Sequence, residues 1–105
     1  MNIRINGFTF EGPYFDTLFL REWPGVYVVL DFNSINDFIV LDVGESDNIK
    51  RRIETHDRCT CWHRHLKRKL AYAVLYDPLI YDPNWDRSAI EKKLRELTNP
   101  PCGER

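Results

Sequence analysis

The chain has 105 residues, of which 43% are hydrophobic and 30% charged, and its formal net charge is −1. This length suits a single domain, and this balance is typical of a folded globular chain rather than a disordered one. The longest apolar runs, such as Val26–Leu30, cover only a few residues, so the sequence predicts no membrane span and no membrane partner.

The first 24 residues give the least regular pattern. Residues 2–5 (NIRI) are compatible with a short edge strand, but Gly12, Pro13 and Pro24 interrupt the segment that follows. We expect residues 1–24 to form an irregular N-terminal extension that packs on the sheet, and residues 25–103 to form the core of the domain.

Three later segments read as buried strands. Gly25–Phe32 and Phe38–Gly44 are rich in β-branched and aromatic residues, and the five residues between them favour an antiparallel hairpin. Leu70–Asp77 has the same composition and is the third strand.

The first predicted helix follows the second strand. Ser46 or Asp47 can cap its start, Ile49 and Ile53 face inward at i and i+4, and it ends near His56. Residues 59–69 are expected to form a second short helix or a loop.

The last predicted helix covers residues 87–98. Asp86 or Ser88 can cap it, and Ile90, Leu94 and Leu97 form an apolar stripe. The fold predicted from this order is α/β (α+β), with a small, three-stranded, mainly antiparallel sheet flanked by helices.

The cations are concentrated in one part of the chain. Residues 1–45 hold two Lys/Arg against seven Asp/Glu, whereas residues 46–70 hold eight against three. A net charge near zero argues against a protein that coats long stretches of nucleic acid, but a local basic patch can recognise a phosphate. The alternative is a solvated helix face without a ligand.

The start of the first helix is a candidate phosphate site. Gly44 is expected to end the strand, so that the free N–H groups of the helix and its positive dipole end face the turn. Arg52 and His56 lie one turn apart on the same side, where a guanidinium and an imidazole can contact phosphate oxygens. The alternative is an ordinary loop and helix.

Several motifs occur in a characteristic order. The sequence has GVY at residues 25–27, DVG at 42–44, GESDNIKRRI at 44–53, HDR at 56–58 and SAIEKKLRELTNPPCG at 88–103. In this order they resemble the signatures of the GIY-YIG nuclease superfamily, which includes homing endonucleases and the bacterial excision-repair incision nuclease. The resemblance covers about three-quarters of the chain.

The resemblance implies a GIY-YIG endonuclease-like fold and a divalent-metal-dependent endonuclease that hydrolyses phosphodiester bonds of DNA. Tyr27 would orient or deprotonate the attacking water, Arg52 would stabilise the phosphate, and His56 would assist proton transfer or bind the phosphate. Glu91 would bind one Mg²⁺ or Mn²⁺ ion. A phenol has a pKa of about 10, so Tyr27 acts as a base at neutral pH only if the basic helix or the metal lowers that pKa.

The expected partner is DNA, with structured or branched forms or a partner protein supplying specificity, and the expected location is the cytoplasm. The residues expected to contact phosphate or nucleic acid are Gly44, Ser46, Asn48, Lys50, Arg51 and Arg64.

Two positions depart from the family pattern. Asp42 stands where the second signature usually has tyrosine, and Glu45 stands where the excision-repair branch often has lysine. Both changes add negative charge where a polyanion must dock. The alternative function is therefore a catalytically inactive GIY-YIG-derived module that binds nucleic acid or protein.

Each proposed catalytic residue also has a structural interpretation. Tyr27 can be a core tyrosine whose hydroxyl is satisfied by a neighbour, and Arg52 can pair with Glu45 or Glu54. Glu91 can complete a capping box with Ser88, or pair with Arg87 or Arg95 on the same helix.

The three cysteines, an odd number, suit reduced thiols in a cytosol. The less favoured alternative to free thiols is a structural zinc site. Its candidate ligands are His56, Cys59, Cys61, His63, His65 and Cys102. Its spacing is not that of a common zinc module, so we do not expect zinc.

Overall fold

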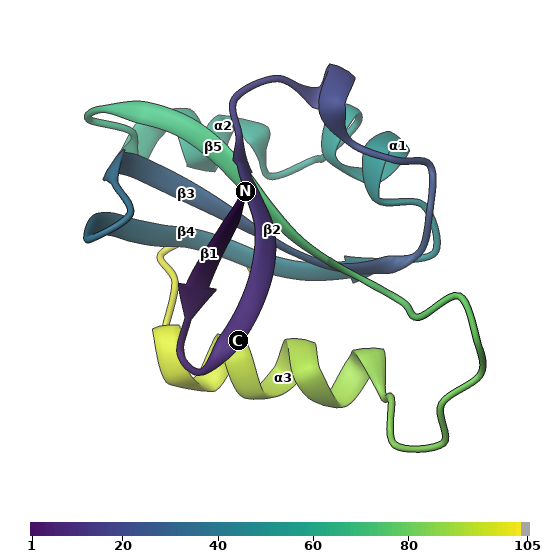
Figure 1. Cartoon of the computed structure of the whole chain (residues 1–105). Coiled ribbons are helices and arrows are strands. Elements are labelled where there is room, and N and C mark those ends of the chain that lie inside the picture. Colours follow the sequence, from purple (N-terminus) through teal and green to yellow (C-terminus); the bar gives the residue numbers. More distant parts are fainter. Residues whose placement is uncertain (104–105) are drawn as a thin grey trace.

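Five antiparallel strands form one sheet, in the order β1-β2-β5-β3-β4, in the computed structural model, which describes residues 1–103. The strands are β1 (Asn2–Ile5), β2 (Phe8–Tyr14), β3 (Gly25–Ser34), β4 (Asp37–Ser46) and β5 (Lys69–Tyr76). The helices are α1 (Ile49–Glu54), α2 (Cys59–His65) and α3 (Arg87–Thr98), with a 3-10 turn, η1, at Thr17–Phe19. Figure 1 shows α1 and α2 on one face of the sheet and α3 on the other.

The three strands predicted from the sequence are confirmed. β3 and β4 form the expected antiparallel hairpin, in which Tyr27 pairs with Gly44, and β5 pairs with the other side of β3. Because β3 has a neighbour on each side and helices above and below, seven of its ten residues are buried. Full burial explains why its sequence is apolar without alternation.

The predicted strand number was wrong, because the sheet has five strands rather than three. The segment expected to be an irregular extension contributes β1 and β2. β1 is an edge strand, as the sequence of residues 2–5 allowed. Gly12 and Pro13 interrupt the register between Glu11 and Tyr14 without ending the strand. Gly12 has φ +122°, a conformation that favours glycine, and a side chain there would lie 2.8 Å from the Tyr72 carbonyl oxygen.

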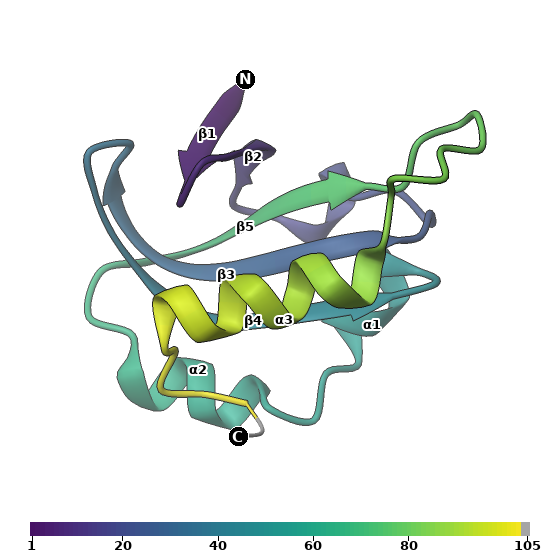
Figure 2. The ribbon, with the colours of Figure 1, turned by 90° about the horizontal axis from the view of Figure 1, so that it is seen from below.

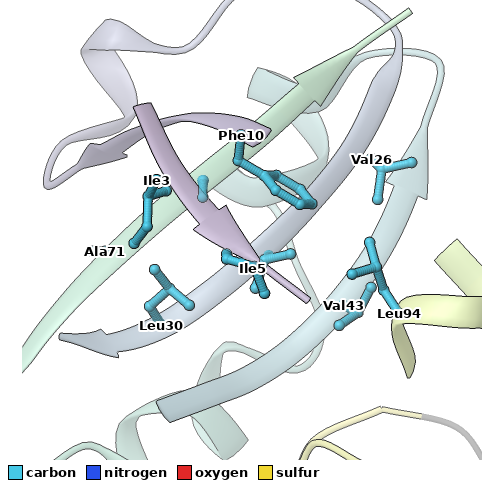
Figure 3. Packing of buried hydrophobic residues seen from close by; sticks show 10 residues of the cluster. Ile3, Ile5, Phe10, Val26, Leu30, Val43, Ala71 and Leu94 are labelled. Carbon is cyan, nitrogen blue, oxygen red and sulfur yellow. The ribbon is translucent and has the colours of Figure 1, made fainter. Parts of the chain in front are cut away.

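Each face of the sheet carries its own hydrophobic core. Figure 2 shows α3 lying across β3 and β4, and Figure 3 shows the side chains gathered on this face. They include Ile3, Ile5, Phe10, Val26, Leu30, Val43, Ala71 and Leu94. The opposite core lies under α1 and α2 and includes Tyr27, Val29, Leu41, Ile49, Ile53 and Trp62.

The helices differ from the prediction mainly at their ends. α1 ends at Glu54, and its cap is Asn48, whose side chain accepts a hydrogen bond from the N–H of Arg51, rather than Ser46 or Asp47. α2 is a helix of seven residues. No helix within residues 1–103 has the length and apolar character needed to cross a bilayer.

α3 has the predicted bounds, and Asp86 is its cap. Ile49 and Ile53 face inward as predicted, and so does Leu94, but Leu97 is 55% exposed and lies outside the core.

A disulfide joins Cys61 of α2 to Cys102 near the C-terminus. The prediction of reduced thiols is therefore wrong for this pair, whereas Cys59 is a free, exposed thiol. After α3 the chain turns back towards α2, and the N–H of Cys102 donates to the carbonyl of Leu41. The two cysteines are 41 residues apart in the sequence, which gave no sign of their contact.

Candidate functional site

A buried tyrosine–histidine pair lies between β3 and α1. The Tyr27 ring enters the core on the α1 side of the sheet, and its hydroxyl oxygen lies 2.6 Å from Nε2 of His56. Tyr27 is only 1% exposed and His56 only 5%. The structural interpretation of Tyr27, a core ring with a satisfied hydroxyl, is therefore confirmed.

The backbone fixes which imidazole nitrogen carries the proton. The N–H of Arg58 points at Nδ1 of His56 at 3.0 Å, and a backbone N–H can only donate. Nδ1 is therefore the acceptor in the neutral imidazole, and Nε2–H donates to the Tyr27 oxygen.

Burial moves both pKa values away from neutrality. It raises the pKa of Tyr27 to about 12, assisted by the charge of Asp42, and Arg52 and Arg58 only partly oppose that rise. Burial, with the charges of Arg52 and Arg58, lowers the pKa of His56 to about 4. The expectation that the basic helix lowers the pKa of Tyr27 was thus wrong in its net direction, and both groups are neutral at pH 7.

Gly44 makes room for the tyrosine ring and does not end the strand. β4 continues to Ser46, so the predicted strand-ending turn at Gly44 was wrong. A Cβ added at Gly44 would lie 2.2 Å from the hydroxyl oxygen of Tyr27 and 2.3 Å from Cζ. A glycine is needed here for a close side-chain approach rather than for a phosphate.

The substitution Gly44→Ala is expected to lower the free energy of unfolding by about 2–3 kcal/mol, because the Tyr27 ring is fixed by its core and by His56 and cannot move aside freely. Urea unfolding measures this loss. In a Tyr27→Val background the same change should cost much less, since the ring it meets is gone. An equal loss in both backgrounds would contradict the steric explanation.

The first N–H groups of α1 are already occupied. Ile49 N donates to the carbonyl of Trp23 and Lys50 N to that of Arg21, while Arg51 N donates to the Asn48 side chain. The prediction that free N–H groups at the start of this helix face the turn was therefore wrong. The N-terminal segment and Asn48 supply the acceptors that a phosphate would otherwise provide.

Side chains rather than backbone amides form the open part of this region. A hollow of about 200 Å³ is lined by Ser46, Asp47, Asn48, Arg51, Arg52 and Thr55. Arg52 pairs with Asp57 at 3.4 Å, not with Glu45 or Glu54 as the sequence suggested, and Asp57 is 77% exposed. Arg51 has no ion-pair partner within residues 1–103.

The hollow contains three of the six residues expected to contact nucleic acid, namely Ser46, Asn48 and Arg51, and Arg52 of the predicted catalytic set lies beside them. Of the others, Lys50 is turned away and donates to the carbonyl of Thr17 at 3.2 Å. Arg64 is exposed on α2, and Gly44 lies under the Tyr27 ring. Three members of the set of six thus line the hollow, and three do not.

Asp42 is the centre of a polar network that sequence reasoning did not assemble. Its buried carboxylate accepts from Nε of Arg58 at 2.8 Å and from the indole N–H of Trp62 at 2.9 Å. Its other oxygen accepts from Val43 N at 2.8 Å and from Arg95 at 3.4 Å, and Arg95 also donates to the Val43 carbonyl. The sequence signal was a carboxylate inside an apolar strand, which requires partners when buried.

Glu91 pairs with an arginine on its own helix. It belongs to α3, which covers the opposite face of the sheet from α1 and α2, and its carboxylate accepts from Nε of Arg95 at 3.2 Å. It does not line the hollow beside Arg52, and Asp86 rather than Ser88 caps α3, so the capping-box alternative was wrong. The ion pair with Arg95 is the alternative that is confirmed.

Glu91 is a poor fit for the implied Mg²⁺ or Mn²⁺. These ions take oxygen ligands, and a single carboxylate can hold one together with water and a substrate phosphate. Here, however, a guanidinium that stays positive already bonds the carboxylate, and it would oppose a divalent cation.

Glu45 does not block the hollow. Its carboxylate accepts from Nε of Arg87 at 2.5 Å, and Arg87 also bonds Asp77 at 3.2 Å. The charge of Glu45 is thus neutralised by the start of α3.

Comparisons with known proteins identify no relative of this chain. A scan of protein-family models, a search of curated proteins and a search of solved structures found no match to this chain.

Proposed function

We propose that this chain is a GIY-YIG-type domain that binds the phosphodiester backbone of DNA without cutting it. The observation that carries this proposal is the hollow beside α1, where Arg51 and Arg52 lie next to each other with hydroxyl and amide side chains around them. Guanidinium groups hold phosphate oxygens in a two-pronged, charge-assisted contact.

The positive charges of Arg51 and Arg52 are less neutralised by nearby carboxylates than those of four other arginines. Arg58, Arg68, Arg87 and Arg95 each bond a carboxylate that is buried or half-buried. Arg51 has no such partner in the described chain, and the exposed Arg52–Asp57 pair at 3.4 Å contributes little. A phosphate can therefore replace Asp57 at low cost.

The titrating groups favour binding over hydrolysis. A general base works best with a pKa near the working pH, whereas the pKa of Tyr27 is raised to about 12 and that of His56 is lowered to about 4. Both side chains are also buried, so neither reaches water in the hollow directly.

The second candidate is the metal-dependent DNA endonuclease implied by the resemblance. The observation that favours it is that Tyr27, Arg52 and His56 come together from different parts of the chain, as that mechanism requires. In this candidate Arg52 would stabilise the phosphate, Tyr27 and His56 would handle the proton of water, and Glu91 would hold Mg²⁺ or Mn²⁺ only after release from Arg95. Either function is proposed to operate in the cytoplasm.

Replacing both Arg51 and Arg52 with alanine is expected to weaken DNA binding at least about tenfold, the factor that corresponds to about 1.4 kcal/mol, because two charge-assisted phosphate contacts are lost. The plot of log affinity against log salt should also become shallower by about 2. Fluorescence anisotropy with labelled branched and linear DNA measures both quantities.

The matched control is Lys92→Ala with Lys93→Ala, which removes the same charge from the exposed face of α3. Equal weakening by the two double variants would mean that net charge, not the hollow, determines affinity. The same samples with Mn²⁺ report cleavage. Cleavage that is lost in Arg52→Ala and Glu91→Ala would establish the second candidate instead.

A further inference from the structure

Three soft metal ligands meet where α2 faces the C-terminal segment. The sulfurs of Cys61 and Cys102 and a ring nitrogen of His65 all lie within 4.8 Å of one another. Cys61 and His65 are four residues apart, so they project from the same side of α2. Cys102 is buried, Cys61 half-buried and His65 exposed, so the cluster borders solvent on one side.

We propose that reduction of the Cys61–Cys102 disulfide opens a zinc site made of these two thiolates and His65. Two sulfurs and one imidazole form a ligand set that zinc prefers over magnesium or calcium. The inference is independent of DNA binding, because none of the three residues lines the hollow beside α1.

The geometry requires only small movements. Zinc–sulfur bonds of about 2.3 Å in a tetrahedron place two sulfurs about 3.8 Å apart. The Cα atoms of Cys61 and Cys102 are 5.9 Å apart, so rotation of the two side chains reaches that separation without a shift of the backbone. Water completes the fourth position on the exposed side, next to His65.

Of the six histidines and cysteines considered as zinc ligands from the sequence, only Cys61, His65 and Cys102 lie together. His56 is committed to Tyr27 and the Arg58 N–H, and does not belong to the cluster. Cys59 and His63 are each two residues from Cys61 along α2, a spacing that turns their side chains away from it. This division makes Cys59 and His63 matched controls on the same helix.

The disulfide and the zinc complex are mutually exclusive states. A dithiol reductant transfers two electrons and two protons to the Cys61–Cys102 bond, giving two thiols while the reductant becomes a disulfide. Zinc then displaces both thiol protons as it binds, so its affinity increases with pH. In either state a covalent or metal bond holds the C-terminal segment against α2.

The test compares the oxidised full chain with the chain reduced by a phosphine, which becomes a phosphine oxide with oxygen from water. After removal of the phosphine, each sample receives zinc, and metal analysis follows gel filtration. We expect one zinc per reduced chain and none per oxidised chain. Cobalt substituted for zinc should show thiolate-to-cobalt absorption, which identifies sulfur ligands.

Variants separate this site from incidental binding. His65→Ala should weaken zinc affinity at least about tenfold. Loss of a residue that only hydrogen-bonds a metal ligand already weakens metal affinity by about that factor, and His65 would be a ligand itself. Because His65 is exposed, this variant keeps the fold and still forms the disulfide. Cys59→Ser and His63→Ala should bind zinc as the unmodified chain does.

Three results would overturn the proposal. They are the absence of zinc from the reduced chain, equal zinc in the oxidised chain, and loss of zinc in Cys59→Ser or His63→Ala as complete as in His65→Ala.

Discussion

Replacing Asp42 with alanine is expected to lower the free energy of unfolding by about 3–5 kcal/mol, the largest effect of any single substitution considered. The carboxylate is fully buried and accepts from Arg58 and from the indole N–H of Trp62. Without it, two arginines that are themselves mostly buried lose their counter-charge, and the indole N–H loses its acceptor. Urea unfolding followed by tryptophan fluorescence measures the loss.

Two controls show whether charge or hydrogen bonding causes the loss. Asp42→Asn keeps an acceptor but removes the charge, and should cost less than Asp42→Ala. Glu45→Ala on the same strand breaks a half-exposed pair with Arg87, and should cost less than about 1 kcal/mol. A loss in Asp42→Ala no larger than in Glu45→Ala would show that the network does not stabilise the fold.

The stability of the folded chain is expected to decrease by about 3 kcal/mol as the pH falls from 6.5 to 4, through His56 alone. The pKa of His56 is lowered to about 4 in the fold, whereas an unfolded histidine has a pKa of about 6.5. Between these values the unfolded chain binds a proton that the folded chain does not. The contribution is therefore complete above pH 6.5 and lost below pH 4.

The structural reason is that a protonated His56 would carry a second N–H. That N–H would face the N–H of Arg58 as well as the exposed carboxylate of Asp57, 3.2 Å from Nδ1, and the new charge would lie beside the guanidinium groups of Arg52 and Arg58. Asp42 and Asp57 act in the opposite direction, but burial and the arginines outweigh them.

His56→Gln isolates this contribution, because glutamine does not titrate and other acidic groups stay in place. Free energies of unfolding measured from pH 7 to pH 4 should show a steeper decrease for the unmodified chain than for His56→Gln. Parallel curves would mean that His56 titrates equally in the folded and unfolded chains.

β3, β4 and β5 could be predicted because each contains a short run of apolar, β-branched or aromatic residues that is buried in the fold. β3 and β5 contain continuous runs of branched and aromatic residues, and β4 contains a shorter one, which is typical of strands covered on both faces. β2 was missed because Gly12 and Pro13 usually end a strand. Here they fall at an irregularity of the β2–β5 pairing, where the N–H of Gly12 donates to the carbonyl of Met1 and Pro13 lies between the two paired residues.

The site could be predicted only in part, because its partners are distant in the sequence. Tyr27, Arg52 and His56, which the resemblance to the GIY-YIG signatures grouped as one set, do lie close together in the fold. An apolar run that contains Asp42 signals a buried charge, but nothing local identifies Arg58 and Arg95, which are 16 and 53 residues away. The occupied amides of α1 depend on carbonyls of the N-terminal segment, which no motif includes.

The pairing of β2 with β5 has a consequence for any shorter form of this chain. A fragment that began at Gly25 would keep every segment that resembles a GIY-YIG signature but would expose the part of the β5 edge, around Tyr72 and Val74, that β2 now pairs with. It would also take away the carbonyls of Arg21 and Trp23 from the start of α1. Such a bare edge recruits strands from other copies, so the fragment would tend to self-associate and precipitate rather than fold as an isolated monomer.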